Sequence, residues 1–191
     1  AYGASLKGKG KVGVSCDGSP AAEMLKISFI SGLLSAGMEV YDFGRMLLPM
    51  TRSAIRFYKV NGGIHISTSA QDEARLFVDF LDKEGSNIDR GTERKIENAF
   101  IREDFSRCEG DCIKIVRTIP DYSEFYLRNI INNVKSGRFK YKIALNAQSK
   151  FVLEKMSILL KSLDCEVETT DLKLIKNGRM KQLDLDYLAD Y

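Results

Sequence analysis

Residues 62–85 read GGIHISTSAQDEARLFVDFLDKEG and contain two strand signals separated by a polar loop. The first run, GIHISTS, is rich in β-branched residues and enters the loop through Ser67, Thr68 and Ser69. The second run, LFVDFLD, alternates apolar and polar side chains and ends at a turn. The two runs are close in sequence and predict a β-hairpin whose loop lies at a strand end.

The residues before this hairpin predict a parallel sheet with helical connections. Strand signals at 11–17 and 38–44 alternate with helical patterns over 21–37 and 50–60, and Gly37 is typical of a helix stop. The order β-α-β-α-β-β predicts parallel strands joined by right-handed crossovers, followed by the hairpin. Because ligands bind outside the carboxyl ends of strands in such sheets, the loop from Ser67 to Asp72 is the candidate site.

The residues after the hairpin predict a helix over 91–107, with Ile96, Phe100 and Phe105 turned inward, then a connection over 108–120. A further helix over 122–134, containing Tyr122 and Tyr126, precedes a second unit of strand, helix and strand over 141–171. We therefore expect an α/β fold with a three-layer α/β/α mixed sheet, followed by a smaller, reduced α/β unit. The expected divisions are a first domain over 1–117, a linker and interdomain helix over 118–136, and the reduced unit over 137–191.

Composition excludes several classes of function. The chain has 44% hydrophobic and 29% charged residues, and its net charge of +3 is spread along the sequence apart from a basic cluster at Lys7, Lys9 and Lys11. No nucleic-acid partner is therefore expected. No run approaches the ~20 apolar residues that span a bilayer, so no membrane partner is expected either.

The cysteines and the start of the chain suggest where the protein resides. Cys16, Cys108, Cys112 and Cys165 lack the second close pair or the neighbouring histidine of a tetrahedral zinc set, so we expect no metal site and reduced thiols in the cytoplasm. The chain does not begin with Met and has no signal peptide, which predicts a piece excised from a longer multidomain protein.

Two other polar groups are expected to be structural. His65 is the sole histidine and lies within a strand, where a packed side chain is favoured over a catalytic base. Asp79 and Asp82 flank the second run of the hairpin, and Asp82 begins a turn that ends at Gly85.

Five segments in order resemble the phosphoglucomutase and phosphomannomutase superfamily. They are SCDGSPAAEML, SGLLSAGMEVYDFG, LLPMT, GGIHISTSAQD and VDFLDKEG, all within residues 11–85. The resemblance implies that Ser69 stands at the family's phosphoserine position and that Ser67, Thr68 and Gln71 are phosphate-binding candidates. It also implies a hexose phosphate as the ligand.

This chain departs from the family pattern at positions where the family has cationic, phosphate-binding or metal-binding residues. Ser19 replaces the family's first-turn arginine, and Ala70-Gln71-Asp72 replaces His-Asn-Pro. Asp79 stands where the family has lysine, and the family's magnesium loop, Asp-x-Asp-x-Asp-Arg, does not occur. Because the loss of one preorganised donor costs ~10²–10³ in rate, phosphoryl transfer by this chain alone is expected to be negligible.

A narrower resemblance is to the degenerate mutase-like region of bacterial sugar-1-phosphate nucleotidyltransferases of the mannose-1-phosphate guanylyltransferase type. It rests on the opening AYGASL and on the loop Thr68-Ser69-Ala70-Gln71-Asp72. The first hypothesis is therefore a non-catalytic domain of such an enzyme, without a cofactor of its own.

Two alternatives stay open. One is a fragment of an active phosphomannomutase or phosphoglucomutase that transfers phosphoryl through Ser69 and needs Mg²⁺. The other is a loop that keeps a phosphate only as an effector. The partners implied are a hexose phosphate, the rest of the parent chain and, as a further option, a second copy of the chain.

Overall fold

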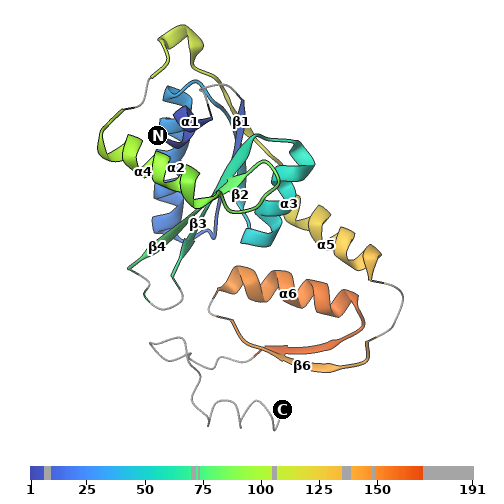
Figure 1. Ribbon diagram of the computed structural model, residues 1–191. Coiled ribbons are helices and arrows are strands. Elements are labelled where there is room, and N and C mark those ends of the chain that lie inside the picture. Colours follow the sequence, from blue (N-terminus) through green and yellow to red (C-terminus); the bar gives the residue numbers. More distant parts are fainter. Residues whose placement is uncertain are drawn as a thin grey trace. The chain divides into compact units, whose positions relative to one another are not determined.

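The structure is a computed structural model that describes residues 1–6, 10–69, 72, 74–104, 107–134, 139–147 and 149–169 (Figure 1). The chain forms two compact units, one of residues 1–68 and 76–123 and the other of Ser69–Arg75 with the chain from Glu124 onward. The elements of the first unit are α1 (Tyr2–Ser5), β1 (Lys11–Cys16), α2 (Pro20–Ser35), β2 (Glu39–Arg45), α3 (Leu48–Tyr58), β3 (Gly62–Thr68), β4 (Leu76–Asp82), α4 (Arg90–Ile101), a 3₁₀ turn (Gly110–Cys112) and β5 (Val116–Thr118).

The first unit is built on a five-stranded mixed sheet with the order β4-β3-β1-β2-β5. Strand β1 pairs in parallel with β2 and β3, and β3 and β4 form the predicted antiparallel hairpin. The expected three-layer α/β fold is therefore confirmed. The carboxyl ends of β1 and β3 lie side by side, because Cys16 pairs with Ile66 at the end of the ladder.

Alternation along the strands divides the core between the two faces of the sheet. Val12, Val14, Ile64 and Ile66 are fully buried in a cluster with residues of α1, α2 and α4. The intervening residues face α3, since a Cβ on Gly63 would meet Ile55 and the hydroxyl of Ser15 lies 2.8 Å from that of Thr51. This period of two is what a strand imposes on its side chains.

The structure corrects two expectations. The segment over 108–120 is more than a connection, because Val116–Thr118 forms β5 and pairs in parallel with β2 at the sheet edge. Helix α4 ends at Ile101, and Phe100 is 69% exposed rather than turned inward; Ile96 is the only residue of α4 in the core cluster. Phe105 lies outside the described residues.

The second unit contains most of α5 (Tyr122–Asn133), together with β6 (Lys142–Leu145), α6 (Lys150–Ser162) and β7 (Glu166–Thr169). β6 and β7 pair in parallel, with Lys142 opposite Glu166, so a small strand, helix and strand unit follows the first sheet as expected. Ser149 caps α6 by accepting the Val152 N–H at 3.5 Å. The tail over 172–191, in which the sequence pattern allows at most one short helix, lies outside the described residues. Among the helices that the structure describes, none has the length and apolar character to cross a membrane.

Candidate functional site

The candidate site begins with Asp17, which directly follows β1. Its backbone N–H donates to the Ile66 carbonyl at 2.9 Å, extending the contact between β1 and β3. One carboxylate oxygen accepts the Ser19 N–H at 2.8 Å, and the other accepts the Thr68 N–H at 2.6 Å. Burial raises the pKa of Asp17, but the hydrogen bonds from Thr68 and Ser19 outweigh this effect and hold the pKa below its ordinary value. Asp17 is therefore ionised, and it links the first turn (residues 17–19, directly after β1) to Thr68 at the end of β3.

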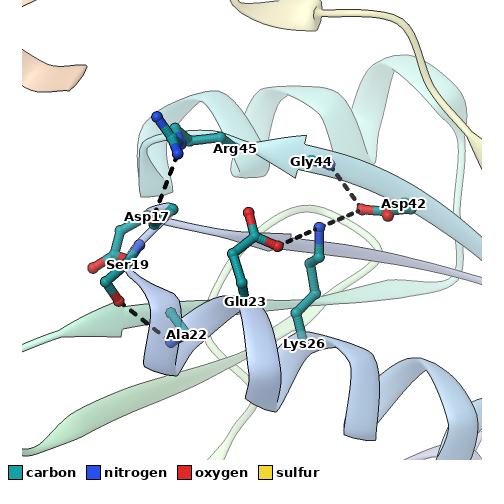
Figure 2. A network of polar contacts seen from close by, with 9 residues as sticks. Asp17, Ser19, Ala22, Glu23, Lys26, Asp42, Gly44 and Arg45 are labelled. Carbon is teal, nitrogen blue, oxygen red and sulfur yellow. Dashed lines mark hydrogen bonds and ion pairs between the residues drawn. The ribbon is translucent and has the colours of Figure 1, made fainter.

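Ser19 and Thr68 form a second link between these loops. The Thr68 hydroxyl donates to the Ser19 hydroxyl oxygen at 2.8 Å, and that same oxygen accepts the Ala22 N–H at 3.3 Å as the N-cap of α2. Figure 2 shows the Ser19 side chain directed at Ala22, at the start of the helix. At the position of the family's first-turn arginine, this chain thus uses a short hydroxyl side chain to cap a helix.

Ser69 lies in a turn that its own neighbours close. Its N–H donates to the Arg75 carbonyl at 2.9 Å, and its hydroxyl oxygen accepts the Asp72 N–H at 3.3 Å. The Asp72 carboxylate accepts the Ala74 N–H at 3.1 Å and pairs with Arg75 at 3.1 Å. Ser69 itself is only 5% exposed. Among the phosphate-binding candidates, Thr68 is bonded to Asp17, Ser67 lies opposite Phe77 in the hairpin, and Gln71 lies outside the described residues.

A polar network that the sequence did not predict lies beside the first turn, at the carboxyl end of β2. Lys26 from α2 is 3.0 Å from Glu23 and 3.2 Å from Asp42, and Asp42 also accepts the Gly44 N–H at 2.9 Å (Figure 2). Burial lowers the pKa of Lys26, but Glu23 and Asp42 outweigh this effect and raise it. The only indication of this network in the sequence is Lys26, a lysine among the apolar residues of the helical pattern over 21–37.

Two groups near this network contact the first turn. Arg45, which ends β2, donates to the Gly18 carbonyl at 3.3 Å. Gly18 has φ of +85°, and a Cβ there would collide with the Arg45 side chain, so glycine is required on both counts. Burial is the main reason that the pKa of the Cys16 thiol is raised to about 11, and a neutral thiol of this kind is unreactive.

His65 is a buried residue of β3. Its Nδ1 is 2.9 Å from the Ser15 hydroxyl and 3.1 Å from the Thr51 hydroxyl, and the residue is 3% exposed. Burial lowers the pKa of His65 to about 4, so the ring is neutral at physiological pH. The expectation of a packed strand histidine is confirmed.

Of the two hairpin carboxylates, Asp82 has a structural role. Asp82 accepts the N–H groups of Glu84 and Ser86, each at 2.9 Å, and so closes the predicted turn. Asp79 lies opposite His65 in the register of β3 and β4. Within the described part of the chain, no three histidine, cysteine or carboxylate side chains gather as a metal site.

Comparison with known proteins identifies the first unit. The model of the phosphoglucomutase/phosphomannomutase α/β/α domain I matches residues 1–107, more than half of the chain. The chain belongs to this family. The family resemblance found in the five segments is thereby confirmed.

Alignments with curated relatives extend over more of the chain than the domain I model does. It is 29% identical over 174 residues to the phosphoglucomutase/phosphomannomutase of Thermococcus kodakarensis, which covers 87% of this chain and 38% of that protein. It is 26% identical over 163 residues to the phosphoglucosamine/phosphogalactosamine mutase of Sulfurisphaera tokodaii, covering 83% of this chain and 36% of that protein. The chain thus spans well under half the length of the curated relatives it matches.

A solved structure shows the same fold. A phosphoglucomutase/phosphomannomutase family protein from Burkholderia thailandensis superposes with a TM-score of 0.77 at 17% identity, over 96% of this chain and 42% of that one. At this identity the match supports the fold alone. None of the proteins named here is a nucleotidyltransferase, so the expected nucleotidyltransferase context gains no support from them.

Proposed function

We propose that this chain is a non-catalytic member of the phosphohexomutase family, in which the serine loop has a structural role. The observation that carries the proposal is the closure of the loop on itself. The Ser69 hydroxyl accepts the Asp72 N–H, the Ser69 N–H is taken by the Arg75 carbonyl, and the Ala74 N–H is taken by the Asp72 carboxylate. Backbone N–H groups are the usual donors to a phosphate in a loop, and these three are already bonded within it.

The charges around the loop support the same proposal. Phosphoryl transfer depends on cations that neutralise the transferring oxygens. Here the Asp17 and Asp72 carboxylates bond to the loop, and the Arg75 guanidinium is paired with Asp72 while 79% exposed. The Mg²⁺ that the active alternative requires finds no cluster of ligands among the described residues. A phosphate on Ser69 would therefore share its short loop with the Asp72 carboxylate, whose partner Arg75 is largely exposed to solvent.

The proposal also concerns the type of parent protein to which this chain belongs. The opening AYGASL and the Ser69-Ala70-Gln71-Asp72 loop favour a cytoplasmic sugar-1-phosphate nucleotidyltransferase of the mannose-1-phosphate guanylyltransferase type as the parent. The relatives named above favour a mutase instead. Sequencing the gene on the 5′ side of the Ala1 codon tests this point, and a reading frame without a nucleotidyltransferase domain would contradict it.

The second candidate function is an active phosphohexomutase, of which this chain is one part. The names of the relatives favour it. In that case Ser69 would carry a phosphoryl group and the ligand would be a hexose phosphate, with Mg²⁺ supplied by the rest of the protein.

Labelling distinguishes the two functions. The chain and the full-length natural protein are each incubated with Mg²⁺ and glucose or mannose 1,6-bisphosphate, and Ser69 is examined by peptide mass spectrometry. We expect an unmodified Ser69, with the Thermococcus kodakarensis relative as the positive control. A phosphoryl group on Ser69 that disappears in Ser69→Ala would establish the active mutase. Calorimetric binding of hexose phosphates without labelling would instead support an effector site.

A further inference from the structure

Strand β4 forms one border of the five-stranded sheet, so one side of its backbone has no neighbouring strand (Figure 1). Part of this side is covered by the residues that follow the hairpin turn. The Phe80 carbonyl accepts the Ile88 N–H there at 3.1 Å. The Asp82 N–H donates on the same side to the Ser86 carbonyl at 2.8 Å. The even-numbered residues of β4 therefore point their backbone groups away from β3.

The other part of this border is open. By the alternation of an antiparallel ladder, Leu76 and Val78 also point their N–H and C=O groups away from β3. Within the part of the chain that the structure describes, no hydrogen bond engages these four groups. Edge strands in natural proteins usually carry charges or prolines that prevent pairing with another strand. The segment Leu76–Val78, called the open edge below, reads Leu-Phe-Val and contains neither.

The side chains of the open edge divide between the two faces of the sheet. Leu76 and Val78 are half-buried and pack against the hydrophobic core cluster. Phe77 lies on the opposite face, as the period of two requires, and is 60% exposed. The open edge thus combines unpaired backbone groups with an exposed aromatic ring.

Phe77 is flanked by opposite charges. Arg75 comes two residues before it and Asp79 two residues after it, so the three side chains fall on the same face. Arg75 continues the ladder, since its carbonyl accepts the Ser69 N–H at 2.9 Å. Its side chain is 79% exposed and pairs with Asp72 at 3.1 Å. Along the strand this face therefore presents a cation, an aromatic ring and an anion, in that order.

We propose that the open edge pairs with the open edge of a second copy of this chain, antiparallel and about a two-fold axis at Phe77. In this register Leu76 lies opposite Val78 of the second copy, and the two residues exchange N–H···O bonds in both directions. The two-fold axis repeats this exchange, so every open backbone group of both copies gains a partner.

The side chains favour a second copy over an unrelated strand. Phe77 meets Phe77 of the second copy at a non-hydrogen-bonded position, where cross-strand side chains lie closest. Arg75 lies opposite Asp79 of the second copy, and the symmetry forms this pair twice. Opposite charges directly across from each other stabilise a sheet. A register shifted by two residues would break both charge pairs, so the order cation, ring, anion is complementary to itself in this register.

The length of the open edge fits the same pairing. Beyond Asp79 the next border position belongs to Phe80, whose carbonyl is already bonded to Ile88. Residues 75–79 of each copy therefore take part, which is the usual length of a strand. One strand pair is a small interface, so the association is weak and is measured at high protein concentration.

The test measures molar mass against concentration by sedimentation equilibrium, from about 5 to about 500 µM. The mass of the wild-type chain should rise from 21.5 kDa toward twice that value. Arg75→Asp and Asp79→Arg each place like charges opposite each other at both pairs, and each should weaken association by about tenfold. An equal mixture of these two variants should associate as the wild type does, because every cation then faces an anion again.

A backbone variant and a control complete the test. Val78→Pro removes an N–H that the second copy needs and that β3 does not use, so it should also weaken association by about tenfold. Arg94→Asp makes the same charge change as Arg75→Asp at an exposed position on α4, and it should dimerise as the wild type does. Circular dichroism checks the fold of each variant, and if Val78→Pro fails to fold, the charge variants decide.

Three results would each overturn the proposal. One is a wild-type chain that stays at 21.5 kDa at the highest concentration. Another is a mixture of Arg75→Asp and Asp79→Arg that associates no better than either variant alone, because the charge pairs would then not form. The third is equal weakening by Arg94→Asp, because the effect would then come from net charge in general.

Discussion

The Asp17 carboxylate accepts the backbone N–H of Thr68 at 2.6 Å, although 51 residues separate the two in sequence. This bond joins the turn after β1 to the end of β3. It holds in place the residue that directly precedes Ser69. The position of Thr68 thus depends on a carboxylate in another loop.

We predict that Asp17→Ala loosens the serine loop without unfolding the sheet. The variant loses the bonds to the N–H groups of Thr68 and Ser19, and partial exposure limits the loss of stability to about 1–2 kcal/mol. Hydrogen exchange of the Thr68 amide should become faster. Asp89→Ala, which removes the cap of α4, is the control and should leave that amide protected. Unchanged Thr68 exchange in Asp17→Ala would contradict the prediction.

We predict that Lys26→Met destabilises the first unit by about 2–4 kcal/mol. The variant removes the buried cation that Glu23 and Asp42 share and leaves these two partly exposed carboxylates without it. Urea denaturation followed by circular dichroism measures the change. Lys95→Met, at an exposed position on α4, should shift the midpoint little. Equal effects of the two substitutions would show that the network contributes nothing.

His65 should make the free energy of unfolding depend on pH below neutrality. The histidine pKa is about 4 in the folded chain and 6.5 in the unfolded one, so between these values the unfolded state binds more protons. Stability from this group is complete above pH 6.5 and falls as the pH is lowered toward 4, by at most about 3.5 kcal/mol. In His65→Gln this part of the pH dependence should vanish. Parallel stability curves for the two proteins between pH 4 and 6.5 would rule the effect out.

Two glycines should respond to alanine with opposite signs. A Cβ on Gly62 would lie 2.8 Å from the Leu81 carbonyl oxygen and would also meet the Tyr2 hydroxyl, so Gly62→Ala should cost about 1–3 kcal/mol. Gly32 has open space, and Gly32→Ala should stabilise the monomer by up to about 1 kcal/mol. Thermal unfolding at low micromolar concentration compares them. A shift in the same direction for both would contradict the packing described here.

The sequence predicted most of the first sheet because hydrophobic periodicity is a local signal. The strands and helices from 11 to 82 match the predicted segments closely, and the hairpin follows from two neighbouring runs. Strand β5 was missed because all three of its residues are exposed, which leaves no apolar alternation to detect. Phe100 was misplaced because the helical pattern does not show where α4 leaves the core.

For the candidate site, the sequence by itself determined the order of elements, the family, and the presence of Ser69 in a loop after a strand. Only the tertiary structure decided what surrounds that serine and its neighbours. Asp17 meets Thr68, Lys26 meets Asp42, and His65 meets Ser15 and Thr51, across separations of 14 to 51 residues. Such contacts depend on how the parallel strands are aligned and on which side of the sheet each side chain faces. Neither property can be predicted from a short stretch of sequence, because both are set only when the strands pair.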